Sequence, residues 1–310
     1  MRHQLSVVVV AYDMTRELPR TLASLALPYQ RGIDISDYEV VIVDNGSPVP
    51  IDATLAEQLP GRLRILRIDT APSSPARAAN AGVAAATGDL IGLIIDGARI
   101  ASPGLLAHAL LARRLSTRAV ITSPAYHLGS VRHMDAREAG YDQQVEDELL
   151  ASCDWKQDGY KLFGISALAG SSGRGWFGPM GESSALFLPV ELWRELDGLD
   201  ERFDLPGGGL VNHDLYRRAC ALDEARLIVL LGEGTFHQIH GGAATARRFT
   251  FDEMQAQYEA IRGARYQPPG VAPLYVGTIP PDALSHVEES ARLAINRHRR
   301  AHETGSDPGG

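Results

Sequence analysis

Apolar runs rich in β-branched residues alternate along the chain with stretches whose apolar positions recur at helical spacing. Continuous apolar runs of this length are typical of strands buried on both faces of a parallel sheet. The pattern predicts strands over 5–12, 38–47, 62–69, 90–96, 119–125, 183–189 and 225–233, and helices near 18–28, 76–88, 103–115, 190–198 and 213–223. This alternation predicts an α/β fold with a mainly parallel central sheet and right-handed crossovers.

The segments outside this alternating pattern indicate how the chain is organised into domains. Residues 130–180 lack a regular pattern and include a glycine-rich stretch, which indicates either a mobile lid or an insertion that faces an acceptor. From about 249 the pattern is helical, and we expect the apolar positions Leu284, Val287, Ala291 and Ile295 to dock the last helix on the main body. We predict a main domain over 1–245 with a loop-rich insertion near 126–180, a helical C-terminal extension over 246–300 and a disordered tail over 301–310.

Composition narrows the functional classes. The 310 residues carry a formal net charge of −8, which argues against a surface that coats nucleic acid. Cys153 and Cys220 form no C-x-x-C pair, as expected in a reducing compartment. No segment is apolar for the roughly 18 residues of a transmembrane span. We expect a cytoplasmic protein. The basic residues Arg297, Arg299 and Arg300 interact favourably with the dipole at the end of their own helix, and a peripheral contact to anionic lipid is the alternative.

Polar residues follow three of the predicted parallel strands. They are Ala11-Tyr12-Asp13, Asp44-Asn45-Gly46 and Asp96-Gly97. The carboxyl ends of parallel strands meet at one edge of a sheet, where open α/β folds bind ligands. A simple turn is the alternative at Asp44 and at Asp96. We expect these ends to converge on one crevice.

These segments in this order resemble family 2 glycosyltransferases with the GT-A fold. The resemblance rests on VVVVAYDMTRELPRTLASL, VVIVDNGS and ARAANAGVAAATGDLIGLIID, and it extends to GESSALFLPVELWRELDGLDERFD, HDLYRRA and HQIHGG. It implies an enzyme that moves a sugar from a nucleotide-diphosphate donor to a saccharide or other hydroxyl acceptor, with inversion. It also implies a nucleotide-binding half over 1–100 and an acceptor half over 101–245.

The resemblance further implies roles for individual residues. The donor-binding positions are Ala11, Tyr12 and Asp13 beside the nucleoside, Asp44 on the base, Arg77 toward the diphosphate with Asn80 nearby, and Asp96 on the ribose. Asp96 would also hold a divalent cation, Mn²⁺ or Mg²⁺, and His240 would complete the metal shell. The adjacent His237 is interpreted as a packed or hydrogen-bonded side chain, with a ligand role as the alternative.

The sequence departs from the family in the D-x-D motif, which reads Asp96-Gly97-Ala98 and is followed by Arg99. The second acid is absent. We therefore expect a weakly held metal that depends on the donor's phosphate oxygens. The alternative is that Arg99 replaces part of the metal's charge, so that the activity is independent of metal.

The residue at the usual position of the general base also departs from the family pattern. The usual position falls near Asn212, which cannot accept a proton at neutral pH. Asp214 is the nearest carboxylate and our first choice for the base, with a structural N-cap role as the alternative. Glu182 is the second candidate. Trp176 and Phe177 are expected either to stack on a sugar ring or to anchor the loop around them.

Two other functions remain open. A nucleotidyltransferase would require a G-x-G-T-R-like loop after the first strand, and AYDMTREL lacks one. A non-catalytic protein that binds a nucleotide sugar or a partner is the second rival, because Ala98 and Asn212 replace two acids of the family pattern.

Overall fold

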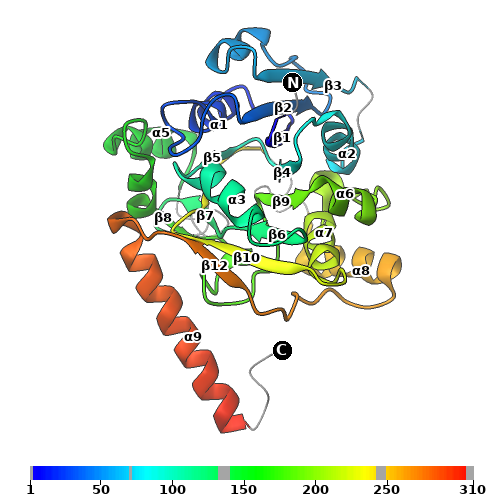
Figure 1. Cartoon of the computed structure of the whole chain (residues 1–310), viewed down its shortest axis with the longest axis vertical. Helices are drawn as coiled ribbons and strands as arrows, with labels where there is room; N and C mark the ends of the chain where they lie inside the picture. Colours follow the sequence, from blue (N-terminus) through cyan, green and yellow to red (C-terminus); the bar gives the residue numbers. More distant parts are fainter. Residues whose placement is uncertain (1–2, 70–71, 132–139, 242–248, 305–310) are drawn as a thin grey trace.

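The central sheet has eight strands in a computed structural model that describes residues 3–69, 72–131, 140–241 and 249–304 (Figure 1). Their order is β12-β10-β6-β9-β4-β1-β2-β3, and β9 alone among them runs antiparallel to its neighbours. The strands are β1 (Leu5–Ala11), β2 (Tyr38–Asp44), β3 (Leu63–Arg67), β4 (Leu90–Ile94), β6 (Ala119–Thr122), β9 (Leu186–Pro189), β10 (Arg226–Leu231) and β12 (Leu274–Gly277). The predicted α/β class with a mainly parallel sheet is confirmed.

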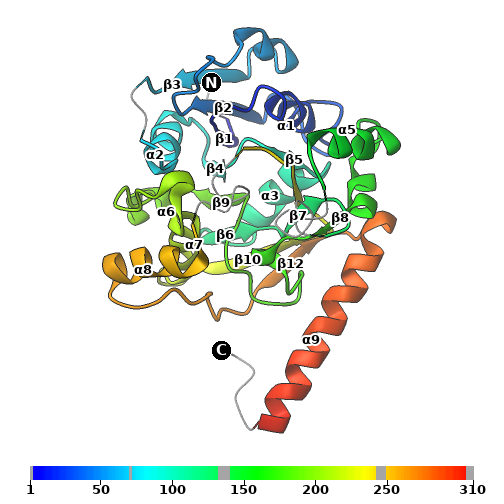
Figure 2. The ribbon, with the colours of Figure 1, turned by 180° about the vertical axis from the view of Figure 1, so that it is seen from behind.

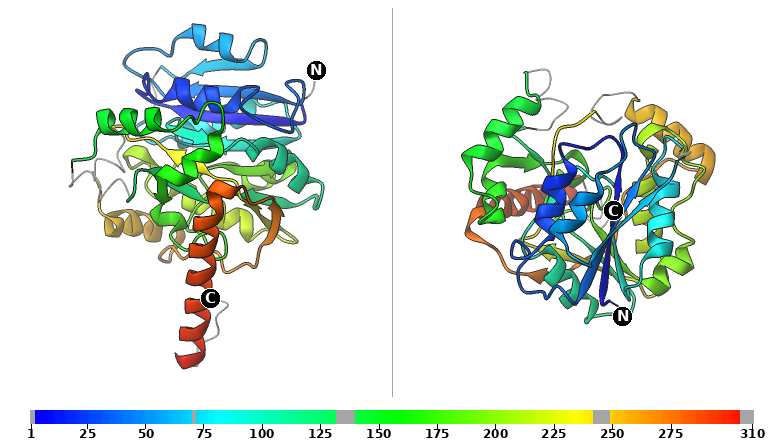
Figure 3. Two further views of the ribbon diagram at one scale, coloured as in Figure 1. Left: turned by 90° about the vertical axis from the view of Figure 1, so that its left-hand side faces the viewer. Right: turned by 90° about the horizontal axis from the view of Figure 1, so that it is seen from above.

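Helices cover both faces of this sheet (Figure 3). One face packs against α1 (Leu18–Leu25) and α3 (Leu105–Arg113), and the other against α2 (Ala76–Ala85), α6 (Val190–Leu196) and α7 (Val211–Cys220). The valines of β1 alternate between these layers, with Val7 and Val9 in one core and Val8 and Val10 in the other. This period of two explains why the strand is apolar at every position.

A smaller sheet lies beside the central one. It contains, in order, β5 (Arg99–Ala101), β11 (Thr235–His237), β7 (Ala125–Leu128) and β8 (Ser166–Leu168). The sequence pattern did not predict β5, β8 or β11, because a strand of three residues is too short to display alternation. β5 follows β4 after a short turn, so the small sheet begins next to the carboxyl end of the central strand β4.

The segment expected to be irregular contains ordered elements. It includes α5 (Gln143–Ser152) and two 3₁₀ helices, Gly159–Ile165 and Gly170–Ser172; further 3₁₀ helices are Ala53–Gln58, Pro206–Gly208 and Pro281–Ala283. Asp147 on α5 forms ion pairs of 2.6 Å with both Arg16 and Arg20, near the start of α1. These ion pairs fasten α5 to the layer of the fold that contains α1. Residues 132–139 of this segment lie outside the described residues.

The C-terminal extension consists of α8 (Phe251–Arg262), β12 and α9 (Leu284–Thr304). A capping box of Thr250 and Glu253 begins α8. β12 joins the edge of the central sheet beside β10. The extension therefore contains a strand, whereas the sequence predicted only helices there. The distal part of α9 projects away from the body (Figures 1 and 2), and the tail from residue 305 lies outside the described residues.

The predicted docking stripe of α9 is confirmed only in part, because Val287 packs against the core of the main body. Leu284 and Ile295 are each 52% exposed, whereas His286 and Ser290 are buried. The imidazole of His286 lies 2.9 Å from the carbonyl of Phe163, and the hydroxyl of Ser290 accepts a hydrogen bond from a backbone amide in the glycine-rich loop. Polar contacts of this kind leave no signal in an apolar periodicity. No helix among the described residues combines the length and apolar character of a membrane span.

Candidate functional site

The carboxyl ends of β1, β2 and β4 lie side by side. Ala11 pairs with Asp44 across β1 and β2, and its carbonyl accepts a hydrogen bond from the amide of Asn45 at 2.8 Å. The amide of Gly97 donates to the carbonyl of Val10 at 2.8 Å, and a Cβ at Gly97 would lie 3.0 Å from that of Ala11. Glycine at this position therefore allows the turn after β4, which carries Asp96, to approach the end of β1.

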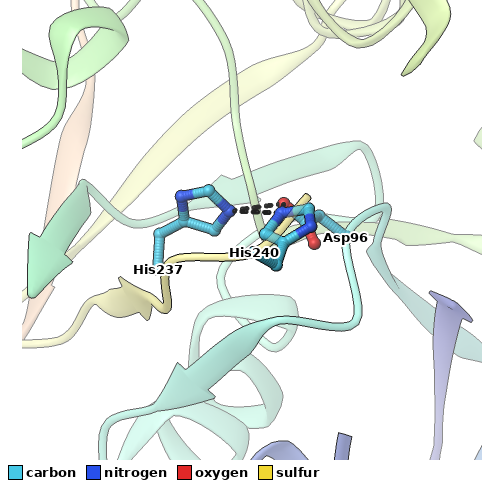
Figure 4. A group of neighbouring side chains, drawn as sticks. All are labelled: Asp96, His237 and His240. Carbon is cyan, nitrogen blue, oxygen red and sulfur yellow. Dashed lines mark hydrogen bonds and ion pairs between the residues drawn. The ribbon is translucent and has the colours of Figure 1, made fainter. Parts of the chain in front are cut away.

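Asp96 forms a compact group with two histidines (Figure 4). Its Oδ2 lies 2.7 Å from Nε2 of His237 and 3.5 Å from Nε2 of His240, and the two Nε2 atoms are 3.1 Å apart. One ligand-type atom from each residue lies within 4.8 Å of the other two. Side-chain atoms from two distant segments of the chain thus point at one small volume.

The backbone around the histidines is held by contacts on both sides. His237 ends β11, and the amide of the next residue, Gln238, donates to the carbonyl of Ala98 at 2.8 Å. The amide of Ile239 donates to the carboxylate of Glu146 on α5 at 2.7 Å. The small sheet and α5 together therefore fix the position of the histidine loop relative to Asp96.

The protonation of the three side chains is coupled. Burial alone would raise the pKa of Asp96, but the adjacent His240 and His237 hold it well below its usual range. Burial lowers the pKa of His237 to about 4 despite the nearby carboxylate. Burial opposes protonation of His240 as well, yet Asp96 outweighs it and raises the pKa of that imidazole. At neutral pH the group offers a carboxylate and a neutral imidazole, the forms that bind metal.

The donor set fits a divalent transition metal. A carboxylate oxygen and two imidazole nitrogens within 4.8 Å of one another can bind one ion. The sequence favoured His240 over His237 as a ligand, whereas the structure brings both to Asp96. In the sequence, only the spacing of three residues between the two histidines could have indicated a ligand pair. That spacing does not show where the side chains point unless it is known that a strand ends at His237. Ala98, in the place of the second acid, is fully buried.

Asp44 is buried at the end of β2 and organises the turn that follows. Its Oδ1 accepts a hydrogen bond from the amide of Ser47 at 2.8 Å, and its Oδ2 pairs with Arg67 at 2.5 Å. Carboxylate oxygens can accept more than one hydrogen bond, so this geometry allows a further donor. Contact with a nucleotide base remains a prediction for Asp44.

The other predicted donor-binding residues differ in their surroundings. Tyr12 is 53% exposed, and Asp13 has a left-handed backbone with φ of 52° while its amide donates to the hydroxyl of Ser47. Arg77 is exposed on the first turn of α2. Asn80, by contrast, binds Leu199 at both backbone groups, with distances of 2.8 and 2.9 Å. Asn80 therefore fastens the loop after α6, a role that the sequence did not predict.

The prediction that Asp214 is the base is not supported by its geometry. Asp214 is fully buried, its Oδ1 accepts from Arg262 at 2.6 Å, and its Oδ2 accepts from Arg218 and Arg262 at 2.7 Å. The N-cap alternative also fails, because α7 is capped at Leu210 and Asp214 lies inside the helix. Two permanent cations occupy the carboxylate, and it joins α7 to α8.

Glu182 lies on the loop before β9, and Asn212 on α7 donates to its carboxylate at 2.8 Å. His213 is 3.6 Å away. Burial would raise the pKa of Glu182, but the charges of His213 and Arg99 and hydrogen bonds from Asn212 and Ser171 hold it below its usual range. The amide at the family's base position thus orients a carboxylate that is ionised at neutral pH.

Trp176 belongs to the core. It is fully buried, and its indole nitrogen donates to the carbonyl of Leu230 at 3.1 Å. The anchoring interpretation therefore holds for this side chain, and stacking on a sugar ring does not. Tyr266, after α8, donates to the carbonyl of Gly181 and packs edge-on against His213 with ring centroids 5.2 Å apart, so the C-terminal extension contacts the residues next to Glu182 and Asn212.

Comparisons with solved structures show the fold. TarS from S. aureus aligns with 12% identity and a TM-score of 0.51 over 83% of this chain and 42% of its own, so this chain spans less than half of that protein. TarS 1–349 in complex with UDP-GlcNAc aligns with 14% identity and a TM-score of 0.52 over 85% of this chain and 68% of its own. The mannosyltransferase PcManGT from Pyrobaculum calidifontis, in complex with GDP-Man and Mn²⁺, aligns with 17% identity and a TM-score of 0.53 over 100% of this chain and 78% of its own. No curated protein matches the sequence.

The sequence comparison agrees with the motifs. Residues 6–140 match the family model described as Glycosyl transferase family 2. This range contains β1, β2, β4 and the Asp96 turn, which carry the predicted resemblance. Residues 6–140 are thus similar to family 2 glycosyltransferases, and the chain shares the fold of TarS and PcManGT.

Proposed function

We propose that this chain is a glycosyltransferase that moves a sugar from a nucleotide-diphosphate donor to an acceptor hydroxyl. The observation that carries the proposal is the meeting of Asp96, His237 and His240 at the carboxyl end of β4, beside the ends of β1 and β2. Open α/β sheets bind nucleotides at this edge. Similar proteins bind UDP-GlcNAc or GDP-Man with Mn²⁺, which supports the same class of donor here.

Asp96, His237 and His240 would hold the divalent cation. When bound, such an ion supplies Lewis-acid stabilisation of the charge that develops on the leaving diphosphate. Two imidazoles and one carboxylate favour Mn²⁺ over Mg²⁺, because Mg²⁺ prefers oxygen ligands. Asp44 and the end of β1 would hold the nucleoside, with Tyr12 and Asp13 at the rim and Arg77 toward the diphosphate.

Glu182 is the base in this proposal. It accepts the proton of the acceptor hydroxyl as that oxygen bonds to the anomeric carbon. The bond from that carbon to the phosphate oxygen breaks, and the nucleoside diphosphate leaves with the electron pair from the opposite face, which inverts the anomeric centre. Asn212 orients the carboxylate through its amide at 2.8 Å, and the lowered pKa keeps Glu182 ready to accept a proton at neutral pH.

Donor turnover by the purified full chain tests the proposal. UDP-GlcNAc, GDP-mannose and other nucleotide sugars are incubated with the chain and Mn²⁺, and release of the nucleoside diphosphate is measured. We expect release from one donor, loss of release in Asp96→Asn, and no change in Arg292→Gln, which alters an exposed residue of α9. Binding of a nucleotide sugar with no turnover of any donor would favour the non-catalytic alternative.

A further inference from the structure

Arg99 is a largely buried cation next to the Asp96 cluster. Its side chain is 11% exposed, and its Nη2 lies 3.9 Å from Oδ2 of Asp96. Its Nε and Nη1 are shielded from solvent and have no hydrogen-bond partner among the described residues. A buried guanidinium whose donors are unpaired is costly, so this arrangement favours an anionic ligand.

The position of Arg99 in the small sheet directs it toward the site. Arg99 begins β5 and is the register partner of His237 on β11, and His237 is the partner of His127 on β7. Directly paired residues share one face of a sheet. Arg99 also lowers the pKa of both Glu182 and His237, so its charge acts on the proposed base and on the metal-type cluster alike.

Asp96 does not neutralise Arg99 in a close ion pair. The same oxygen, Oδ2, lies 2.7 Å from His237, and the 3.9 Å to Arg99 exceeds hydrogen-bond distance. The guanidinium retains donors that can form the forked hydrogen bonds by which arginine binds phosphate.

We propose that Arg99 binds the diphosphate of the nucleotide sugar directly and takes over part of the charge neutralisation that a metal ion held by the second acid of a D-x-D motif would provide. This inference rests on the proposed function. It also accounts for two neighbouring departures together: an alanine at 98 removes a metal ligand, and an arginine at 99 adds a permanent cation.

The positive charge of Arg99 should affect the binding of the diphosphate and the binding of the divalent cation in opposite directions. The charge that attracts a diphosphate repels a divalent cation held by Asp96, because both charges are close together and partly shielded from water. Removing the charge should therefore weaken diphosphate binding and strengthen binding of the metal alone. Loss of a purely structural side chain would weaken both.

The test compares the wild-type chain with Arg99→Gln, Arg99→Lys and the charge-matched control Arg292→Gln. Calorimetry measures UDP, GDP, ADP, CDP and dTDP in EDTA, and separately Mn²⁺ without nucleotide. In Arg99→Gln we expect the affinity for the preferred diphosphate to fall about tenfold and the affinity for Mn²⁺ to rise at least about threefold. Arg99→Lys should retain much of the diphosphate affinity, and Arg292→Gln should match the wild type.

The outcomes separate the two proposals. If the wild-type chain turns over a donor, two results would overturn the role of Arg99 and leave the proposed function standing. In the first, Arg99→Gln binds the diphosphate and Mn²⁺ as tightly as the wild type does. In the second, Arg99→Gln and Arg99→Lys both lose affinity for the diphosphate and for Mn²⁺. If the wild-type chain binds none of the five nucleoside diphosphates and turns over no donor, both proposals fail.

Discussion

Two carboxylates of this protein, one partly buried and one fully buried, have opposite kinds of partners. Asp96, at the end of β4, lies within 3.5 Å of two imidazoles, whose charge depends on pH and on ligands. Asp214, inside α7, accepts three hydrogen bonds of 2.6–2.7 Å from Arg218 and Arg262. Neutral imidazoles can turn to a metal ion, whereas guanidinium groups stay charged and keep the carboxylate occupied.

The partners of an acid, rather than its place in a motif, separate a ligand site from a structural one. Both residues lie in segments of the sequence that resemble the family pattern, although Asp96 is 20% exposed and Asp214 is fully buried. Removing a buried carboxylate's charge from its partly buried cations mainly costs stability, while breaking a metal-type cluster at a sheet edge mainly costs binding. The following predictions test this distinction.

The largest effect is expected for Asp96→Asn. An amide provides no charge for a cation, so turnover of the donor should fall at least about a thousandfold. The melting temperature should change by less than about 5 °C. Initial rates of diphosphate release and a thermal melt measure the two quantities, and turnover close to that of the wild type would remove Asp96 from the site.

Glu182→Gln should lower kcat about a hundredfold or more while the affinity for the donor stays unchanged, because the carboxylate acts on the acceptor's proton. Since the pKa of Glu182 lies below its usual range, loss of its proton-accepting form should begin only at acidic pH. A rate profile with kcat and KM separated checks this: kcat should show no protonation of Glu182 between pH 8 and 5, and a fall centred inside that range that Glu182→Gln abolishes would contradict the lowered pKa. An equal loss of donor affinity would place Glu182 in donor binding instead.

Asp214→Asn should act mainly on stability. Arg218 and Arg262 would be left beside a neutral amide, which costs about 3 kcal/mol in the free energy of unfolding. Urea denaturation measures this change, and turnover per folded molecule should stay within about twofold of the wild type, a margin set by indirect effects. Unchanged stability together with lost turnover would restore Asp214 as the base.

The smallest effect is expected for Asn80→Ala. The substitution removes two hydrogen bonds to the backbone of Leu199 and should lower the free energy of unfolding by about 1–2 kcal/mol. Its affinity for nucleoside diphosphates, measured by calorimetry, should equal that of the wild type. A tenfold loss of affinity would return Asn80 to the donor site.

Sequence reasoning succeeded where the signal is local. The long strands and Asp96 at the end of β4 follow from apolar runs and a turn within a few residues. It failed where the deciding partner is distant, since Arg262 lies 48 positions after Asp214 and Asn212 lies 30 after Glu182. His237 was undervalued for the same reason, because its neighbours Asp96 and Arg99 are defined only once β11 pairs with β5.

The most direct measurement of the central claim is anomalous diffraction from crystals of the chain grown with Mn²⁺ and the preferred nucleoside diphosphate. The account predicts one manganese peak bound by Asp96, His237 and His240, with the diphosphate beside it and within reach of Arg99. A nucleotide bound at another edge of the sheet, or a diphosphate in this crevice with manganese held elsewhere, would contradict it.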